Sequence, residues 1–322
     1  MVSVNSRLRE LDFLRGIAII LVLFRHQNLF DFTKKMGWIG VDLFFVLSGF
    51  LVSGLLFKEY KKFGNLQPGL FLIRRGFKIY PLYYLTYFLY LAIKIIKNQF
   101  DLTGFLSEIF FIQNYVTGWG YAYVPTWSLA VEEHFYFGLA FLFLAGLKLK
   151  LFDFDEKSKS NRISNFELSI LFLLIITFIM RIYSNIYIPE NEAKNITMTH
   201  LRMDSLLAGV LVSYLYYFKN DWLTSNFHKY KKSLLVIALL FLSFAPFVDF
   251  EESIYVRIFG FTLLYISFSI ILILFLVQKN INEKLDAVFS RKVVDFIGKI
   301  GLSSYSIYLT HGLVITCCSV LN

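Results

Sequence analysis

Charged residues are scarce in this chain of 322 residues, and long stretches contain almost none. Only 17% of the residues are Asp, Glu, Lys or Arg, whereas 57% are hydrophobic and 19% are aromatic. Residues 168–180 and 254–277 are almost continuously apolar, and Arg257 alone interrupts the second stretch. A soluble chain of this length would show amphipathic helices or alternating strands. The composition therefore excludes an ordinary soluble protein.

Cysteine is equally scarce, because the two cysteines, Cys317 and Cys318, are adjacent in the last apolar segment. This excludes a disulfide framework and a four-ligand metal site, so we expect no metal. We interpret both as small apolar side chains in a helix. Short alternating segments are missing too, which disfavours a membrane β-barrel. We find no internal repeat, no low-complexity tract and no separate soluble domain.

What is present predicts an all-α fold, a polytopic bundle of transmembrane helices with a single membrane domain over residues 1–322. Nine spans follow from the apolar runs: 11–30, 38–57, 80–97, 127–147, 166–188, 200–218, 233–249, 254–277 and 300–320. Residues 104–116 are apolar but short and contain Glu108, so we expect a re-entrant or interfacial segment. Arg15 interrupts the first span, which argues against a cleaved signal peptide.

The net charge of +9 orients this bundle rather than indicating a nucleic-acid partner. Loops 58–80, 148–162, 219–232 and 278–299 hold twenty Lys and Arg against eight Asp and Glu. The opposite loops, 31–37, 98–126, 189–200 and 249–253, hold three against eight. Cytoplasmic loops carry an excess of basic residues. We therefore expect the N-terminus and the basic loops in the cytoplasm.

Two ionisable residues in the first span, Arg15 and His26, are the first candidates for function. Eleven residues are about three helical turns, roughly 16 Å, so both side chains fall on nearly the same face. We expect Arg15 near the cytoplasmic interface and His26 about half a hydrocarbon thickness deeper. Ionisable groups inside a membrane are costly and mark functional sites.

Further polar residues lie inside or beside the predicted spans. They are Asp12, Arg25, Asp42, Ser48, Glu132, Glu133, His134, Arg181, Arg202, Asp204, Arg257 and His311. We interpret Arg25, Arg181 and Arg257 as structural residues that snorkel to the interface.

Six stretches, read in order, resemble the membrane acyltransferase-3 family, bacterial proteins that O-acylate cell-surface sugars. They are residues 9–19 with His26, 40–50 (Gly-Val-Asp-Leu-Phe-Phe-Val-Leu-Ser-Gly-Phe), 74–83 (Arg-Arg-Gly-Phe-Lys-Ile-Tyr-Pro-Leu-Tyr), 127–136 (Trp-Ser-Leu-Ala-Val-Glu-Glu-His-Phe-Tyr), 202–209 (Arg-Met-Asp-Ser-Leu-Leu-Ala-Gly) and 304–311 (Ser-Tyr-Ser-Ile-Tyr-Leu-Thr-His). Each motif alone is weak, but six in the same order are specific.

The sequence departs from the family at two points. Lys78 stands where the second arginine of the paired-arginine motif is expected, which keeps the charge but loses the planar fork. The nine spans are one fewer than the family's usual ten, by nature or by truncation. No hydrolase-like domain follows, so we expect no fused two-domain relay.

The resemblance implies transfer of an acyl group, usually acetyl, from cytoplasmic acyl-CoA to a hydroxyl. The acceptor would be a surface polysaccharide, lipopolysaccharide or lipid-linked sugar, and the protein would be multi-pass in the bacterial inner membrane. His26 is the candidate general base, because a hydroxyl nucleophile needs one. The alternative for His26 is a hydrogen bond within the bundle.

Four basic residues are candidates for donor binding. Arg15 suits a phosphate or the thioester carbonyl, because a guanidinium pairs bidentately with such groups. Its alternative is a pair with Asp12 on the same helix, and both roles are compatible. Arg74, Arg75 and Lys78 would meet the phosphates of acyl-CoA, with anionic lipid headgroups as the alternative.

Glu132 would orient the acceptor hydroxyl or hold one tautomer of His26. The alternative is a structural pair with a basic residue such as Arg202. Other residues in the matched motifs are candidates for acceptor binding: Trp127, Glu133, Arg202, Asp204, Tyr305, Tyr308 and His311. For the two tyrosines, a role at the membrane interface is the alternative. We expect Asp12, Asp42 and Ser48 to be structural.

The rival function is a transporter or flippase of a glycan or lipid-linked substrate, in which buried charges mark a transport path. Transporters usually contain internal repeats and interrupted helices, and this sequence shows no repeat. A non-catalytic scaffold, the third possibility, would not need His26.

Overall fold

The computed structural model describes residues 8–27, 30–152, 154, 163–251 and 253–321, with side chains up to residue 314. Cys317 and Cys318 therefore lie outside the described side chains, as does most of the predicted loop 148–162. Throughout the described part of the chain, every regular element is a helix, as the sequence predicts.

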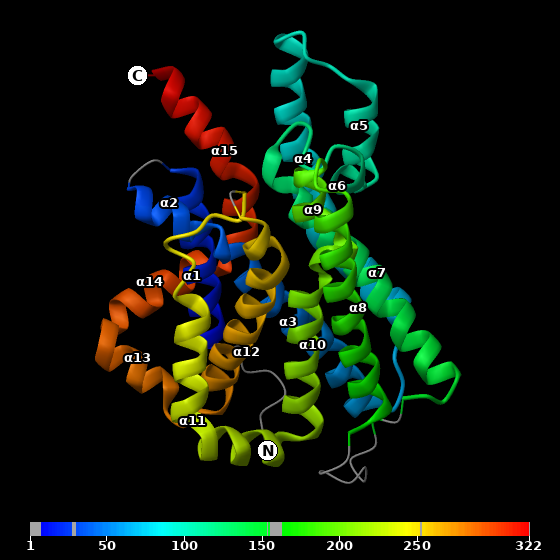
Figure 1. The fold of residues 1–322 in the computed structure, drawn as a ribbon, viewed down its shortest axis with the longest axis vertical. Coiled ribbons are helices and arrows are strands. Elements are labelled where there is room, and N and C mark those ends of the chain that lie inside the picture. Colours follow the sequence, from blue (N-terminus) through cyan, green and yellow to red (C-terminus); the bar gives the residue numbers. More distant parts are fainter. Residues whose placement is uncertain (1–7, 28–29, 153, 155–162, 252, 322) are drawn as a thin grey trace.

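The long helices run alternately up and down (Figure 1). They are α1 (Arg9–His26), α3 (Ile39–Phe63), α4 (Pro68–Ile96), α7 (Trp127–Lys148), α8 (Asn165–Tyr187), α10 (Thr199–Phe218), α11 (Asn220–Leu242), α12 (Phe261–Val277) and α15 (Ser304–Leu321). Each overlaps one of the nine predicted spans. Within the residues that the structure describes, five stretches are long and apolar enough to cross a membrane: Asp31–Phe63, Pro68–Ile96, Val124–Lys148, Asn165–Tyr187 and Val256–Val277. Nine crossings remain a prediction.

Short elements join the long helices. They are α2 (Asp31–Gly37), α5 (Leu102–Ile109), α6 (Gln113–Val116), the 3-10 turn η1 (Val124–Thr126), α9 (Glu192–Thr197), the π-helical η2 (Val256–Gly260), α13 (Ile281–Phe289) and α14 (Arg291–Leu302). The connections at α2, α5, α6 and α9 lie at the end of the bundle opposite the connection between α10 and α11 (Figure 1). The predicted interfacial segment 104–116 forms α5 and α6.

Three of the predicted basic loops are largely helical instead. The helix predicted to begin at residue 80 begins at Pro68, so Arg74, Arg75 and Lys78 lie within α4. Most of the predicted loop 219–232 forms the first turns of α11, and much of the predicted loop 278–299 forms α13 and α14. In all three places the basic residues also fit a loop, which is why the sequence predicts one. Their long side chains instead lie on exposed or cavity-lining faces of a helix.

Helices α3 and α10 make the closest packing at the centre of the bundle. A Cβ added to Gly49 would lie 2.0 Å from the carbonyl oxygen of Leu206. One added to Gly209 would lie 2.1 Å from that of Val46. Small residues allow membrane helices to approach backbone to backbone. Gly49 and Gly209 therefore fix the helix that carries Ser48 and Lys58 against α10.

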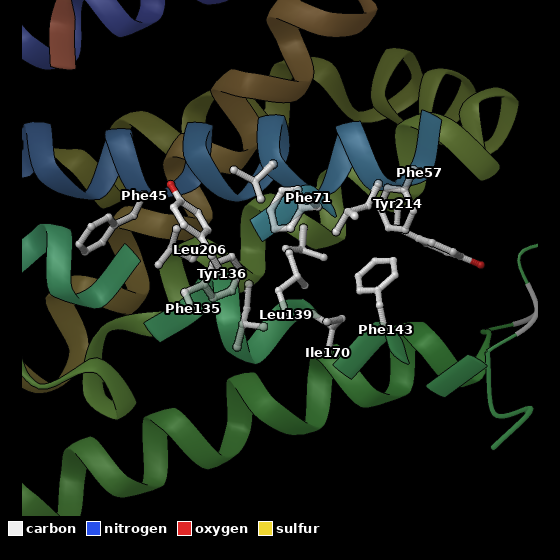
Figure 2. Close-up of a cluster of buried hydrophobic side chains, with 14 of the residues drawn as sticks. Phe45, Phe57, Phe71, Phe135, Tyr136, Leu139, Phe143, Ile170, Leu206 and Tyr214 are labelled. Atoms are coloured by element: carbon white, nitrogen blue, oxygen red, sulfur yellow. The ribbon is translucent and has the colours of Figure 1, made fainter. Parts of the chain in front are cut away.

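The largest buried cluster lies beside this contact and is mainly aromatic. Figure 2 shows Phe57 of α3, Phe143 of α7 and Tyr214 of α10 facing one another. The ring of Phe57 lies 5.4 Å from that of Phe143 and 6.0 Å from that of Tyr214. Edge-to-face and tilted contacts of this kind stabilise the packing beyond area burial alone. The cluster holds α3, α7, α8 and α10 together on one side of the candidate site.

Candidate active site

A cavity of about 410 Å³ lies among α1, α3, α4, α7 and α15. The polar side chains that line it come from these five helices and, in Tyr217, from α10. These residues are Asp12, Arg15, Ser48, Lys58, Arg75, Lys78, Ser128, Glu132, Tyr136, Tyr217, Ser304, Tyr305 and Tyr308. Apolar side chains such as Leu51, Phe44 and Leu129 form the rest of the wall.

Four cationic side chains reach the cavity from the half of the bundle where α1 and α4 begin and α3 ends. Arg15 lies in the second turn of α1 and donates a hydrogen bond to Ser304 Oγ at 3.0 Å. Lys58 lies near the end of α3, and Arg75 and Lys78 lie in the first half of α4. The Arg75 guanidinium carbon lies 5.6 Å from the centre of the Tyr136 ring. Together these side chains give the cavity a positively charged wall.

Glu132 faces this wall from α7. Its half-buried carboxylate lies beside the hydroxyls of Ser48 and Tyr136, which are hydrogen-bonded to each other at 2.8 Å. Arg75 and Arg15 both attract it electrostatically. This hydroxyl pair and the two cations stabilise a carboxylate whose burial would otherwise be costly. Glu132 is thus connected to the basic wall of the cavity.

Ser128, one turn before Glu132 on α7, belongs to a separate group of hydroxyls. Its Oγ lies 2.6 Å from the hydroxyl of Tyr308, which donates to the carbonyl oxygen of Pro125 at 2.9 Å. Ser128 Oγ also donates to that carbonyl, at 3.1 Å. The hydroxyl of Tyr305 donates to the carbonyl oxygen of Ile79 at 2.7 Å. The two tyrosines therefore attach α15 to α7 and α4 along the cavity.

His26 is not among the residues that line this cavity in the described part of the chain. It is the last residue of α1, and its side chain is exposed. Its depth in a membrane stays a prediction. Its ring lies 5.0 Å from that of His311 on α15, centre to centre. Both Arg15 and His26 thus contact α15, through Ser304 and His311.

His311, whose ring contacts that of His26, is held by hydrogen bonds on both ring nitrogens. Its Nδ1 lies 2.9 Å from the carbonyl oxygen of Tyr308, and its Nε2 lies 2.8 Å from the hydroxyl of Tyr123. A carbonyl only accepts, which favours the proton on Nδ1, and the Tyr123 hydroxyl lies 2.9 Å from Nδ1 as well. Tyr123 in turn stacks on Tyr90 with ring centres 4.3 Å apart. These contacts fix the orientation of the His311 ring.

Arg202 and Asp204 lie outside the cavity lining, in two buried ion pairs. Arg202 Nη2 lies 2.8 Å from Asp42 Oδ1, and Arg181 Nη1 lies 2.7 Å from Asp204 Oδ2. Trp127 packs against this group, with the Arg202 guanidinium carbon 5.5 Å from its ring centre. The carboxylate that pairs with Arg202 is thus that of Asp42, so the alternative of a Glu132–Arg202 pair is wrong. The assignment of Asp42 to structure agrees with this placement.

Two other predicted residues also point away from the cavity. Glu133 is buried and accepts a hydrogen bond from the hydroxyl of Tyr80 at 2.9 Å. Arg74 is exposed on α4 and does not belong to the described lining, whereas Arg75 and Lys78 do. A role for Glu133 or Arg74 in binding substrate stays a prediction.

The three arginines interpreted as snorkelling residues have acidic partners instead. Arg25 pairs with Asp249, and Arg181 with Asp204. Arg257, in the π-helical η2, lies 3.5 Å from a carboxylate oxygen of Glu192. Ion pairs within the bundle, rather than the lipid interface, therefore account for these three side chains. Their structural role stays a prediction.

Sequence reasoning missed five polar residues of the cavity: Lys58, Ser128, Tyr136, Tyr217 and Ser304. A signal existed for two of them. Ser128, Glu132 and Tyr136 are spaced four apart, which places them on one face of a helix. The other three face the cavity through contacts between distant helices, which spacing along one segment does not reveal. Among the described residues, no group of three or more His, Cys, Asp and Glu is placed to hold a metal ion.

Comparison with known proteins gives one family over nearly the whole chain. Residues 8–321 match the acyltransferase domain of the acyltransferase-3 family. A putative O-acetyltransferase of Staphylococcus aureus is 29% identical over 334 residues, covering 95% of this chain and 50% of the relative. The peptidoglycan O-acetyltransferase OatA of Listeria monocytogenes is 28% identical over 335 residues, covering 95% and 49%. No solved structure matches.

The chain spans about half the length of these curated relatives. The expectation of a lone membrane domain therefore stays a prediction. The family match is nevertheless nearly complete along the chain, and five of its apolar stretches are long enough to cross a bilayer. The chain belongs to the acyltransferase-3 family of integral membrane proteins.

Proposed function

We propose that this protein transfers an acyl group, most simply acetyl, from cytoplasmic acyl-CoA to a hydroxyl of a cell-surface glycan. The observation that carries the proposal is the cavity in which four cationic side chains meet the Glu132–Ser48–Tyr136 group. A multi-pass arrangement in the bacterial inner membrane, with the N-terminus in the cytoplasm, would open the basic half of this cavity toward acyl-CoA.

The donor's negative charges suit the cationic wall. Arg75 and Lys78, with Lys58 opposite them, would bind the phosphates of coenzyme A. Arg15 would bind a donor phosphate rather than the thioester carbonyl, because eleven residues of helix place it roughly 16 Å from His26, too far for both to act on one acyl carbon. We assign Glu132 to this donor side, where it would hold Arg15 and Arg75 in place. This replaces its expected role beside His26.

The reaction needs a basic group of the protein that removes the proton from the acceptor hydroxyl. His26 would take the proton of the acceptor hydroxyl as its oxygen bonds to the acyl carbon, while the carbon–sulfur bond breaks and coenzyme A leaves as a thiolate. Water would then protonate the thiolate. His26 adjoins the cavity through α15, because the ring centre of His311 is 5.0 Å from that of His26 and 6.0 Å from that of Tyr308.

For the acceptor we propose a hydroxyl of peptidoglycan, in line with the name of the Listeria relative. Tyr305, Tyr308 and His311 remain the candidates for the acceptor side. Buried ion pairs occupy Arg202 and Asp204, which weakens their candidacy for this role. A lipid-linked sugar or another surface polysaccharide would contain the same hydroxyl chemistry.

The test uses the purified chain in lipid nanodiscs with radiolabelled acetyl-CoA and soluble peptidoglycan fragments. We expect release of free coenzyme A with label on the glycan, and at least a hundredfold slower turnover in His26→Ala. Arg75→Gln should raise the KM for acetyl-CoA, whereas Arg74→Gln, exposed one residue away, serves as the matched control and should not.

Two results would overturn the proposal. Movement of a glycan across the bilayer without release of coenzyme A would favour a transporter. Normal turnover in His26→Ala would leave an acyltransferase but remove the assigned base.

A further inference from the structure

The helix pair α13–α14 carries its charges asymmetrically. The acidic side chains Asp286 and Asp295 turn toward α1, where Arg9 contacts both, at 2.7 Å and 2.8 Å. The pair lies at the edge of the bundle, beside α1 (Figure 1). Arg9 offsets one of these two negative charges, and the outward charges on the pair are mainly basic.

The outward surface combines those basic residues with apolar ones. Its exposed basic side chains are Lys284, Arg291, Lys292 and Lys299, with Glu283 as the exposed acid. The side chain of Arg291 is 82% exposed, and its nearest carboxylate is 3.8 Å away. Exposed apolar side chains lie among them: Val288, Phe289, Val293, Phe296 and Leu302. Val288 is 72% exposed and Phe296 is 64% exposed.

This combination fits one kind of partner. Exposed aromatic and aliphatic side chains beside Lys and Arg bind where acyl chains meet anionic headgroups. A soluble acidic partner would match the basic residues but would leave Phe296 and Val288 against water. We propose that α13–α14 is a binding site for anionic phospholipid. Lys284, Arg291 and Lys292 take the phosphate, and Phe289 and Phe296 contact the acyl chains.

Lipid bound here acts on a rigid part of the bundle. A Cβ added to Gly301 would lie 1.9 Å from the carbonyl oxygen of Asp12, and one added to Gly16 would lie 2.1 Å from that of Ile297. Helix α14 therefore rests directly on the backbone of α1. A ligand that stabilises α13–α14 thus stabilises its packing on α1, and thermal stability reports on binding.

The test compares nanodiscs of phosphatidylglycerol with nanodiscs of phosphatidylcholine, using the whole chain. The variant Lys284→Gln/Arg291→Gln/Lys292→Gln removes the three charges. The control Lys148→Gln/Lys229→Gln/Lys232→Gln removes three exposed lysines of α7 and α11. Native mass spectrometry counts retained phosphatidylglycerol, and melting curves measure its stabilising effect.

We expect wild type and control to retain phosphatidylglycerol and to melt at a higher temperature in it. The triple variant should bind it about a hundredfold more weakly, which corresponds to about 3 kcal/mol at about 1 kcal/mol per charge. Equal retention and equal stabilisation in the triple variant would overturn the proposal. If the triple variant fails to fold in phosphatidylcholine, Arg291→Gln/Lys292→Gln answers the same question. Neither readout uses acyl transfer, so the result is independent of the proposed enzyme activity.

Discussion

Removing the carboxylate of Asp42 provides the sharpest test of the ion pairs at the centre of the bundle. Asp42 is fully buried, and its Oδ1 accepts hydrogen bonds from Arg202 at 2.8 Å and from Ser205 at 2.9 Å. Breaking a buried pair from one side usually costs about 3–5 kcal/mol, because the remaining charge is uncompensated. The Phe261 ring lies 3.5 Å from the Arg202 guanidinium carbon and offsets part of this loss.

We therefore expect Asp42→Ala to lower the free energy of unfolding by about 3 kcal/mol. The double variant Asp42→Leu/Arg202→Met should recover most of that loss, since apolar replacement of a whole buried pair is often neutral. Unfolding in mixed detergent micelles with increasing dodecyl sulfate measures both. Arg291→Ala, exposed on α14, is the control and should change stability by less than about 0.5 kcal/mol.

One outcome would refute this reasoning. If Asp42→Ala unfolds like wild type but abolishes acyl transfer, the Arg202–Asp42 pair serves the substrate rather than the fold. A recovered double variant that also regains activity would exclude any direct contact of Arg202 with substrate.

Three further predictions follow from close contacts and from one buried carboxyl group. Gly209→Ala should destabilise the protein by about 1–3 kcal/mol in the same micelle assay, because its Cβ would meet the backbone of α3, whereas Gly138→Ala has open space and should be neutral or stabilising. Burial raises the pKa of Glu108, in the short helix α5, from 4.5 to about 7. Its contribution to stability is therefore full below about pH 4.5 and is lost as the pH rises through about 7. The loss is about 3 kcal/mol. Glu108→Gln should abolish this pH dependence in melting curves recorded at different pH values. Gly312→Ala should lower kcat at an unchanged KM for the donor, because its Cβ would lie 2.4 Å from the ring of Tyr123 and displace His311; an unchanged kcat would contradict this.

The long helices could be predicted from the sequence because their apolar runs are continuous. The segments predicted at 127–147 and 200–218 differ by one residue from Trp127–Lys148 and Thr199–Phe218. Amphipathic helices rich in charged residues could not be predicted from the sequence, because a run of basic residues also fits a loop. The first turns of α4 and the whole of α14 were missed for this reason.

The candidate site divides in the same way. The motifs identified Arg15, Arg75, Lys78 and Glu132, which the fold brings to one cavity. They gave no indication that Arg202 pairs with Asp42, because these residues are 160 positions apart. Pairing between distant helices depends on how the bundle packs, which spacing along one helix does not determine.

Helix α15 acts as a thin partition between two chemical environments. Tyr308 faces the cavity, and His311, three residues later, faces His26. Three residues correspond to about 4.5 Å along a helix axis. If the proposed donor and acceptor bind on these two sides, the thioester end of the donor has to reach past α15, because the acyl carbon must contact the sulfur and the acceptor oxygen in the same step. The nucleotide end of the donor and the rest of the glycan would then each stay on their own side, and the bundle would need no alternating opening of the kind that carries a whole solute across a membrane.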